Sequence, residues 1–180
     1  MFIQGVIVAV IIGYALKGRL KNLERVEIKG FYLIVVAFLL EVLVIILIRR
    51  NVINQGIITY LVDLTMYIIL FYFVYLNKTD PFILIIGFGS LLNAIPIFLN
   101  GGSMPVSHEA AIKVGLTMNV TKEGLYNVIS SSTRVWFLSD IIPYKVISKL
   151  VISIGDIIIA IGLMLFIITG MKRKKFKKIL

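Results

Sequence analysis

Cysteine is absent from this chain of 180 residues, and histidine occurs once. The lack of thiols excludes disulfides, thiol catalysis, iron–sulfur clusters and thioether-attached haem, while a single histidine disfavours the usual zinc sites. We therefore expect neither a metal nor a cofactor. Charged residues are also scarce, at 16% of the chain against 59% hydrophobic residues. A soluble core of this size cannot hide so much apolar surface, so the composition predicts an integral membrane protein.

The hydrophobic residues fall into five runs, at 2–16, 31–48, 57–76, 82–99 and 149–170. They lack the alternation of barrel strands, and at about 1.5 Å per helical residue each can cross a hydrocarbon layer of about 30 Å, the first only just. The sequence thus predicts an all-α polytopic membrane protein. We expect residues 1–180 to form one membrane domain, a bundle of about five transmembrane helices.

Basic residues are distributed unevenly between the two sides of this bundle. The segments 17–30, 77–81 and 171–180 carry twelve Lys and Arg residues, and the opposite side carries seven. The positive-inside rule then predicts an outer N-terminus and a cytoplasmic C-terminus. We expect anionic lipid headgroups, rather than nucleic acid, to be the partners of the basic tail. The residues expected to contact them are Lys172, Arg173, Lys174 and Lys175.

The connection 101–148 is unusually long and lies outside in this orientation. It is too apolar for a free loop, so we expect a partly helical extracytoplasmic lid folded onto the bundle. One short helix is predicted after Ser107 as N-cap, ending near Gly115, and a second from Thr121.

Four polar residues lie inside the expected spans: Glu41, Asp63, Asn93 and Asp156. Such groups cost a few kcal/mol in hydrocarbon and are candidates for function. Counted at 1.5 Å per residue, all four lie about 10 Å below the outer surface. We predict a polar ligand-binding pocket in the outer half of the membrane, completed by Asn100 at the end of the fourth span.

The same residues also fit a purely structural alternative. Small and polar faces are typical of seams where membrane helices approach closely and bond across the contact. The pocket hypothesis makes a sharper statement, because it places Asp63 and Asp156 towards the bundle interior. It also places Asn93 within hydrogen-bonding reach of one of them.

Three segments carry a resemblance: NGGSMPVS (100–107), TRVWFLSDIIP (133–143) and ISIGDIIIAIG (152–162). They are similar to a family of small, functionally uncharacterised bacterial polytopic membrane proteins. That family shares an NGG-x-MPV loop, an Asp-containing loop before a proline and a last helix that opens with S-x-G-D. The resemblance implies a bacterial inner-membrane location and no particular activity.

A second resemblance is to lipoprotein signal peptidase, an intramembrane aspartyl protease. It rests on SIGDIIIAIG, which implies that Asp156 is one catalytic carboxylate, and on GFGSLLN. The pattern departs from that family after Asn93, where the family's Asp-Arg pair is missing, so Asp140 or Asp63 would have to supply the second carboxylate. Two carboxyls that share a proton can activate water for hydrolysis.

The sequence therefore leaves three functional hypotheses. The first is a non-enzymatic protein that binds or transports a small molecule or lipid headgroup through the polar pocket. The second is an aspartyl hydrolase that uses Asp156 with Asp140 or Asp63. The third is a homo-oligomer or a subunit of a larger membrane complex.

Overall fold

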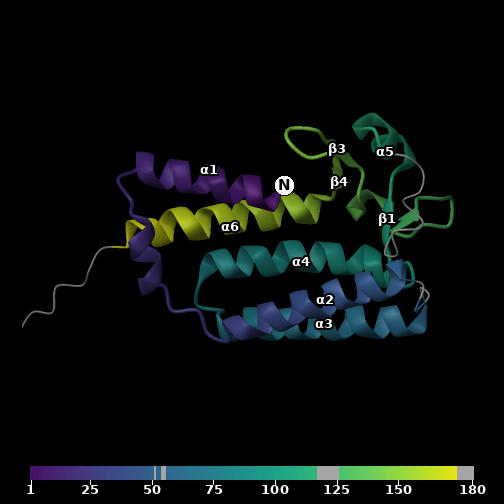
Figure 1. Ribbon diagram of the computed structural model, residues 1–180, viewed down its shortest axis with the longest axis horizontal. Helices are drawn as coiled ribbons and strands as arrows, with labels where there is room; N and C mark the ends of the chain where they lie inside the picture. The colour runs from purple at the N-terminus through teal and green to yellow at the C-terminus, as the bar shows by residue number, and fades with distance from the viewer. Residues whose placement is uncertain (51, 54–55, 117–125, 174–180) are drawn as a thin grey trace, which may run out of the picture.

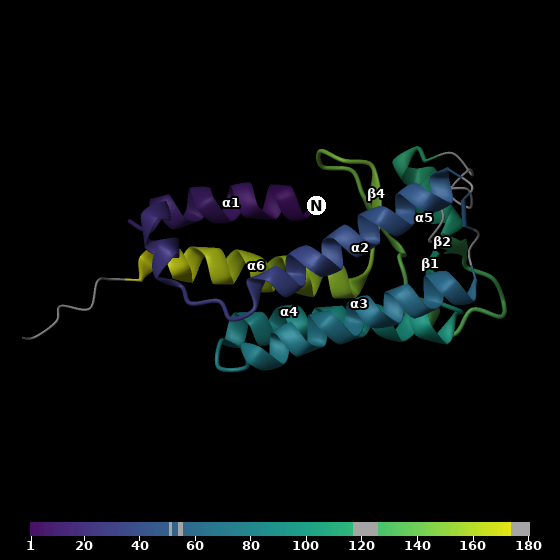
Figure 2. The ribbon, with the colours of Figure 1, turned by 60° about the horizontal axis from the view of Figure 1, so that its bottom comes forward.

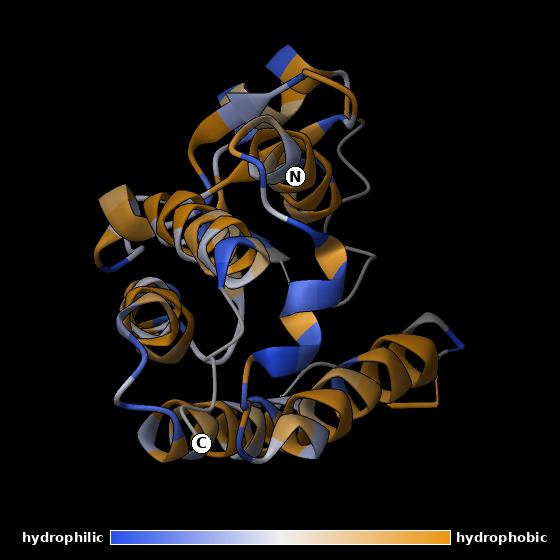
Figure 3. Ribbon diagram, turned by 90° about the vertical axis from the view of Figure 1, so that its left-hand side faces the viewer, coloured by the Kyte–Doolittle hydropathy of each residue, from blue (hydrophilic) through white to orange (hydrophobic). Residues whose placement is uncertain are grey.

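The computed structural model describes residues 1–50, 52–53, 56–116 and 126–173. Its long helices are α1 (Phe2–Ala15), α2 (Phe31–Arg49), α3 (Ile57–Leu76), α4 (Pro81–Leu99) and α6 (Ile154–Lys172). Within the described residues, α2, α3, α4 and α6 are long and apolar enough to cross a membrane. In Figure 3 the ribbons of the long helices are coloured as hydrophobic along most of their length. The predicted all-α polytopic membrane fold is confirmed.

The first helix is shorter than the other long helices. With 14 residues, α1 is about 21 Å long, which falls short of a hydrocarbon layer of about 30 Å. It packs along α6 and runs parallel to it, with Gly5 near Met164 and Gly13 near Met171. The five long helices are therefore four helices of spanning length and one shorter helix that lies against α6.

The long helices are arranged in layers that Figure 1 shows from top to bottom as α1, α6, α4 and the pair α2 and α3. The most extensive contact lies between α4 and α6, and α2 packs mainly on α3. Figure 2 shows the same arrangement after rotation, with α2 inclined relative to α6.

Glycines permit the close approach of α4 and α6. A Cβ atom on Gly89 would lie 2.7 Å from the carbonyl oxygen of Gly155, and one on Gly155 would lie 2.6 Å from the carbonyl oxygen of Gly89. Farther along the same contact, a Cβ atom on Gly162 would lie 2.9 Å from the side chain of Ile86. Backbone contact of this kind is how small residues stabilise helix pairs in membranes, where burial from water contributes little.

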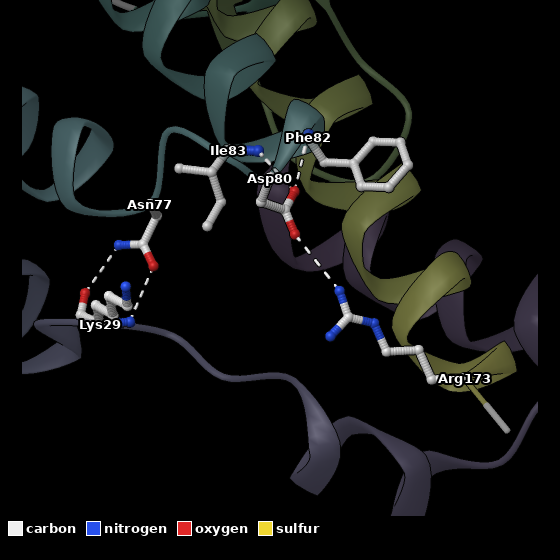
Figure 4. A network of polar contacts seen from close by, with 6 residues as sticks. All are labelled: Lys29, Asn77, Asp80, Phe82, Ile83 and Arg173. Atoms are coloured by element: carbon white, nitrogen blue, oxygen red, sulfur yellow. Dashed lines mark hydrogen bonds and ion pairs between the residues drawn. The ribbon is translucent and has the colours of Figure 1, made fainter. Parts of the chain in front are cut away.

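Polar side chains fasten the helix ends farthest from the lid (Figure 4). The Asn77 amide accepts a hydrogen bond from the backbone N–H of Lys29 at 2.9 Å and donates to the Lys29 carbonyl at 2.8 Å, which joins the end of α3 to the start of α2. Asp80 caps α4 by accepting from the N–H groups of Phe82 and Ile83, and its second oxygen lies 3.9 Å from Arg173. The 3-10 helix η1 (Leu20–Arg25) lies beside the end of α6.

The segment between α4 and α6 contains short elements. They are β1 (Met104–Val106), α5 (His108–Val114), β2 (Tyr126–Val128), η3 (Trp136–Leu138), β3 (Ile142–Tyr144) and β4 (Leu150–Ile152). β1 pairs with β2 in parallel, and β3 pairs with β4 antiparallel. The predicted helix after Ser107 is confirmed, because the Ser107 hydroxyl accepts from Ala110 N–H and the helix ends at Gly115. The second predicted helix, from Thr121, begins outside the described residues.

The last helix begins later than the hydrophobic run suggests. We expected a span from 149, but residues 150–152 form β4, and α6 begins at Ile154. Pairing with β3 holds this stretch extended. Ser153 then starts the helix, because its hydroxyl accepts a hydrogen bond from Asp156 N–H at 2.9 Å.

Replacement of Gly155 tests the α4–α6 contact. We expect Gly155→Ala to lower the free energy of unfolding by about 1–3 kcal/mol, because the added methyl has no room beside Gly89. Titration with a denaturing detergent measures this change. The control is Gly5→Ala, where the new methyl would meet Met164 at an ordinary 3.6 Å, and it should leave stability equal or slightly higher. Equal stability of the two variants would contradict the proposed close contact.

Candidate functional site

A cavity of about 670 Å³ lies between α2, α3, α4 and α6. Its polar lining comprises Glu41, Asp63, Tyr67, Ser90, Asn93, Asp140 and Asp156. Its apolar lining includes Phe31, Ile34, Phe38, Leu70, Phe73, Leu163 and Phe166. Four of the five residues predicted to bind a ligand, all except Asn100, therefore line one cavity.

Asn93 and Asp156 are joined by a network that crosses from α4 to α6. The Asn93 amide donates to Asp156 Oδ1 at 2.9 Å, and its oxygen accepts from the Ser153 hydroxyl at 2.6 Å. The second oxygen of Asp156 accepts from Ser153 N–H at 3.3 Å, so Asp156 also completes a capping box at the start of α6. The predicted contact of Asn93 with an aspartate is confirmed. The same bonds give both residues a structural role.

Glu41 and Asp63 come from the opposite wall of the cavity, on α2 and α3. Both are half-buried. Tyr67, one helical turn beyond Asp63, stacks edge-on against Phe98 with ring centroids 5.3 Å apart. This aromatic contact joins α3 to α4 and places the tyrosine in the cavity lining.

Asp140 reaches the cavity from the lid segment. Its backbone N–H donates to the Pro105 carbonyl at 3.0 Å, and its carbonyl accepts from Ser107 N–H at 2.8 Å. The residue is only 6% exposed, and no group in the described part of the chain hydrogen-bonds its Oδ1. Burial, with a smaller contribution from the charge of Asp156, raises the pKa of Asp140 to about 8.

The sequence assigned Asp140 to the site only in the hydrolase hypothesis. Its backbone pairing with Val106 is a long-range contact that residue spacing does not reveal. The available signal was the apolar stretch Trp136–Leu138 just before it, which is suited to an interface and carries the chain back towards the bundle.

Asn100 lies outside the cavity lining. Its side-chain amide donates to the carbonyls of Pro96 at 2.7 Å and Arg134 at 2.9 Å, and its oxygen accepts from Arg134 N–H at 2.9 Å. These bonds fasten the end of α4 to the segment 133–135. The side chain of Asn100 therefore bonds to backbone groups and has a structural role.

The charge of the cavity is of one sign. Four carboxyl groups line it, and no Lys, Arg or His of the described residues does so. No three acidic or histidine side chains in that part of the chain gather closely enough to hold a metal ion. The acidic side chains can therefore accept hydrogen bonds or bind a positive charge, and the apolar part of the lining can accommodate a hydrocarbon group.

The buried carboxyl of Asp140 makes stability depend on pH. An unfolded aspartate loses its proton near pH 3.8, whereas the folded one retains it to about pH 8. Between these values the folded state binds the extra proton, so the free energy of unfolding falls as pH rises, by at most about 1.4 kcal/mol per pH unit. We expect Asp140→Asn to flatten this dependence in unfolding measurements from pH 5 to 9. The exposed Glu109, replaced by Gln, should keep the wild-type profile, and parallel curves for all three proteins would refute the assignment.

Comparison with known proteins places the chain in a family. The family model DUF5317, described as a family of unknown function, matches residues 25–168. An uncharacterized protein of Thermotoga maritima is 29% identical over 155 residues, which cover 85% of this chain and 82% of that protein. No solved structure matches. The comparisons give no support for the resemblance to lipoprotein signal peptidase, and because the family model covers most of the chain, the protein belongs to the DUF5317 family of unknown function.

Proposed function

We propose that this protein binds an amphipathic small molecule or a lipid in the cavity between α2, α3, α4 and α6. One observation carries the proposal: a cavity of about 670 Å³ combines a wall of phenylalanine, leucine and isoleucine side chains with a cluster of carboxyl groups. This volume lies in the range typical of small-molecule sites, which are mostly apolar with a few polar groups that orient the ligand.

The packing of α2 supports entry from the bilayer. Within the described residues, α2 packs on α3 and makes no extensive contact with α1, α4 or α6. The side of the cavity between α2 and α6 is therefore the least covered by helix packing. A ligand dissolved in the membrane reaches this side without crossing the close contact between α4 and α6.

The proposal includes an orientation. Basic residues lie at the end of the bundle where η1, the start of α2 and the end of α6 meet, including Lys21, Lys29 and Lys172. We propose that this end is cytoplasmic, with Lys172 and Arg173 at anionic headgroups, and that the segment between α4 and α6 is extracytoplasmic. The carboxyl groups of the cavity then lie in the outer half of the membrane.

Single cysteines introduced into this cysteine-free chain test the orientation. Lys113→Cys, at an exposed position of α5, should react with a membrane-impermeant maleimide in intact cells. Lys21→Cys, on exposed η1, should react only after the membrane is permeabilised. The reverse pattern would invert the proposed topology.

Cross-linking with a photoreactive fatty alcohol tests the cavity as a binding site. The probe should label the purified protein in lipid nanodiscs saturably, and unlabelled dodecanol should compete. Ala37→Phe should weaken labelling about tenfold or more, because Ala37 is buried in the cavity wall and the new ring fills the site. The neighbouring Val36, exposed on the outer face of α2, provides the control Val36→Phe, which should label like wild type. Labelling that does not saturate, or that ignores Ala37→Phe, would refute binding in the cavity.

An aspartyl hydrolase is the second candidate function. It is favoured by one observation: Asp140 and Asp156 line the same cavity, and the charge of Asp156 contributes to the raised pKa of Asp140. Two carboxyls at one site can divide the roles of general acid and general base between them. However, both oxygens of Asp156 already accept hydrogen bonds from Asn93 and Ser153, which favours the binding function.

A further inference from the structure

The acidic end of the cavity has no positive partner within the protein. Glu41, Asp63, Asp140 and Asp156 line it, and none of the basic side chains in the described ranges does so. Membrane proteins normally pair or neutralise such groups, because an isolated charge in low dielectric is costly. The missing positive charge is therefore a property that a ligand can supply.

Asp140 shows where a ligand would be bound. Its side chain lines the cavity and is 94% buried, since 6% remains exposed, and its Oδ1 has no hydrogen-bond donor among the described residues. A buried acceptor without a donor is unfavourable, and a ligand that brings a donor to this carboxyl group relieves it. Asp156 differs, because Asn93 and Ser153 already donate to it.

The distribution of the carboxyls selects an organic cation over a metal ion. Calcium and magnesium require several oxygens at about 2.0–2.6 Å from one point, and no three acidic side chains in the described part of the chain meet that closely. An ammonium group instead offers three N–H donors on a larger body, which can reach carboxyls on different helices. Tyr67, whose aromatic ring is of the kind that attracts cations, lines the same cavity.

The apolar part of the cavity lining indicates the chemistry of the rest of the ligand. Phe31, Phe38, Phe73, Leu163 and Phe166 continue the cavity as hydrocarbon surface. A free polyamine or amino acid would leave this wall unfilled, whereas an alkyl chain buries it. A phosphate next to the amine, as in a phospholipid headgroup, would meet four carboxyls and no base.

We propose, building on the proposed binding function, that the ligand is an amphiphile with an ammonium headgroup and no adjacent phosphate. Its headgroup binds at Asp140, in the cavity that Asp63 also lines, and its alkyl chain lies along the phenylalanine wall. Burial, with a smaller contribution from the charge of Asp156, raises the pKa of Asp140, so without a ligand this carboxyl keeps its proton at neutral pH. An ammonium headgroup beside it would favour the ionised form.

Competition among amphiphiles of equal chain length tests the headgroup. Dodecylamine, dodecanol and dodecyl phosphate are compared as competitors of the photoreactive fatty alcohol, with the protein in phosphatidylcholine nanodiscs. We expect dodecylamine to compete about tenfold or more better than dodecanol, and dodecyl phosphate to compete worst. In Asp140→Asn the advantage of the amine over dodecanol should fall about tenfold. Asp63→Asn should lower the preference too, and Glu109→Gln, which changes an exposed carboxylate outside the cavity, should not.

The outcomes separate the two proposals. If dodecanol competes but the amine has no advantage, or if neither Asp140→Asn nor Asp63→Asn lowers the preference, the cationic headgroup is refuted and the binding site stands. If no amphiphile competes and labelling does not saturate, both proposals fall. An amine preference that survives Ala37→Phe unchanged reflects the bilayer rather than the cavity and also overturns the inference.

Discussion

The contact between α4 and α6 is the constraint on which the rest of this structure depends. Backbone approaches backbone at Gly89 and Gly155, and the Asn93 side chain bonds to Ser153 and Asp156 in the space that remains. The two interactions require each other, because Asn93 reaches its partners only when no side chain separates the helices. The short α1 then packs on the outer side of α6, while α3 meets α4 more loosely through Tyr60, Tyr67 and Phe98.

This division explains how a small bundle contains both a tight seam and a cavity. The polar groups of α4 and α6 satisfy one another across the glycine contact, as expected for helices in lipid. On the other side of α4, bulky aromatic residues hold α3 at a distance, and α2 follows α3. The carboxyls of Glu41 and Asp63 therefore face a space rather than a partner helix.

Much of this architecture was predictable because long apolar runs have few alternatives in a membrane. The spans at 31–48, 57–76 and 82–99 agree with α2, α3 and α4 to within one residue at each end. The equal depth of Asn93 and Asp156 in their spans also predicted correctly that the two residues lie close together. The start of α6 was not predictable, because residues 150–152 are as apolar as a helix and become a strand only through pairing with β3. The sequence linked Asp140 to the site only in the hydrolase hypothesis, because its position depends on long-range backbone pairing with Val106. Asn100 was predicted to line the pocket but lies outside it, because its side chain bonds to the backbone of Arg134, which is also distant in the sequence.

The clamp at Asn77 has a mechanical consequence. Its side chain holds the backbone of Lys29 through two hydrogen bonds and the Phe73 carbonyl through a third, so the beginning of α2 cannot leave the end of α3 without breaking them. Any outward movement of α2 that keeps these bonds is a rotation about the contact between Asn77 and Lys29. Displacement then grows with distance from Asn77 along α2, and Glu41 moves farther than Phe31. Such a rotation consequently opens the cavity most at the end lined by the acidic side chains.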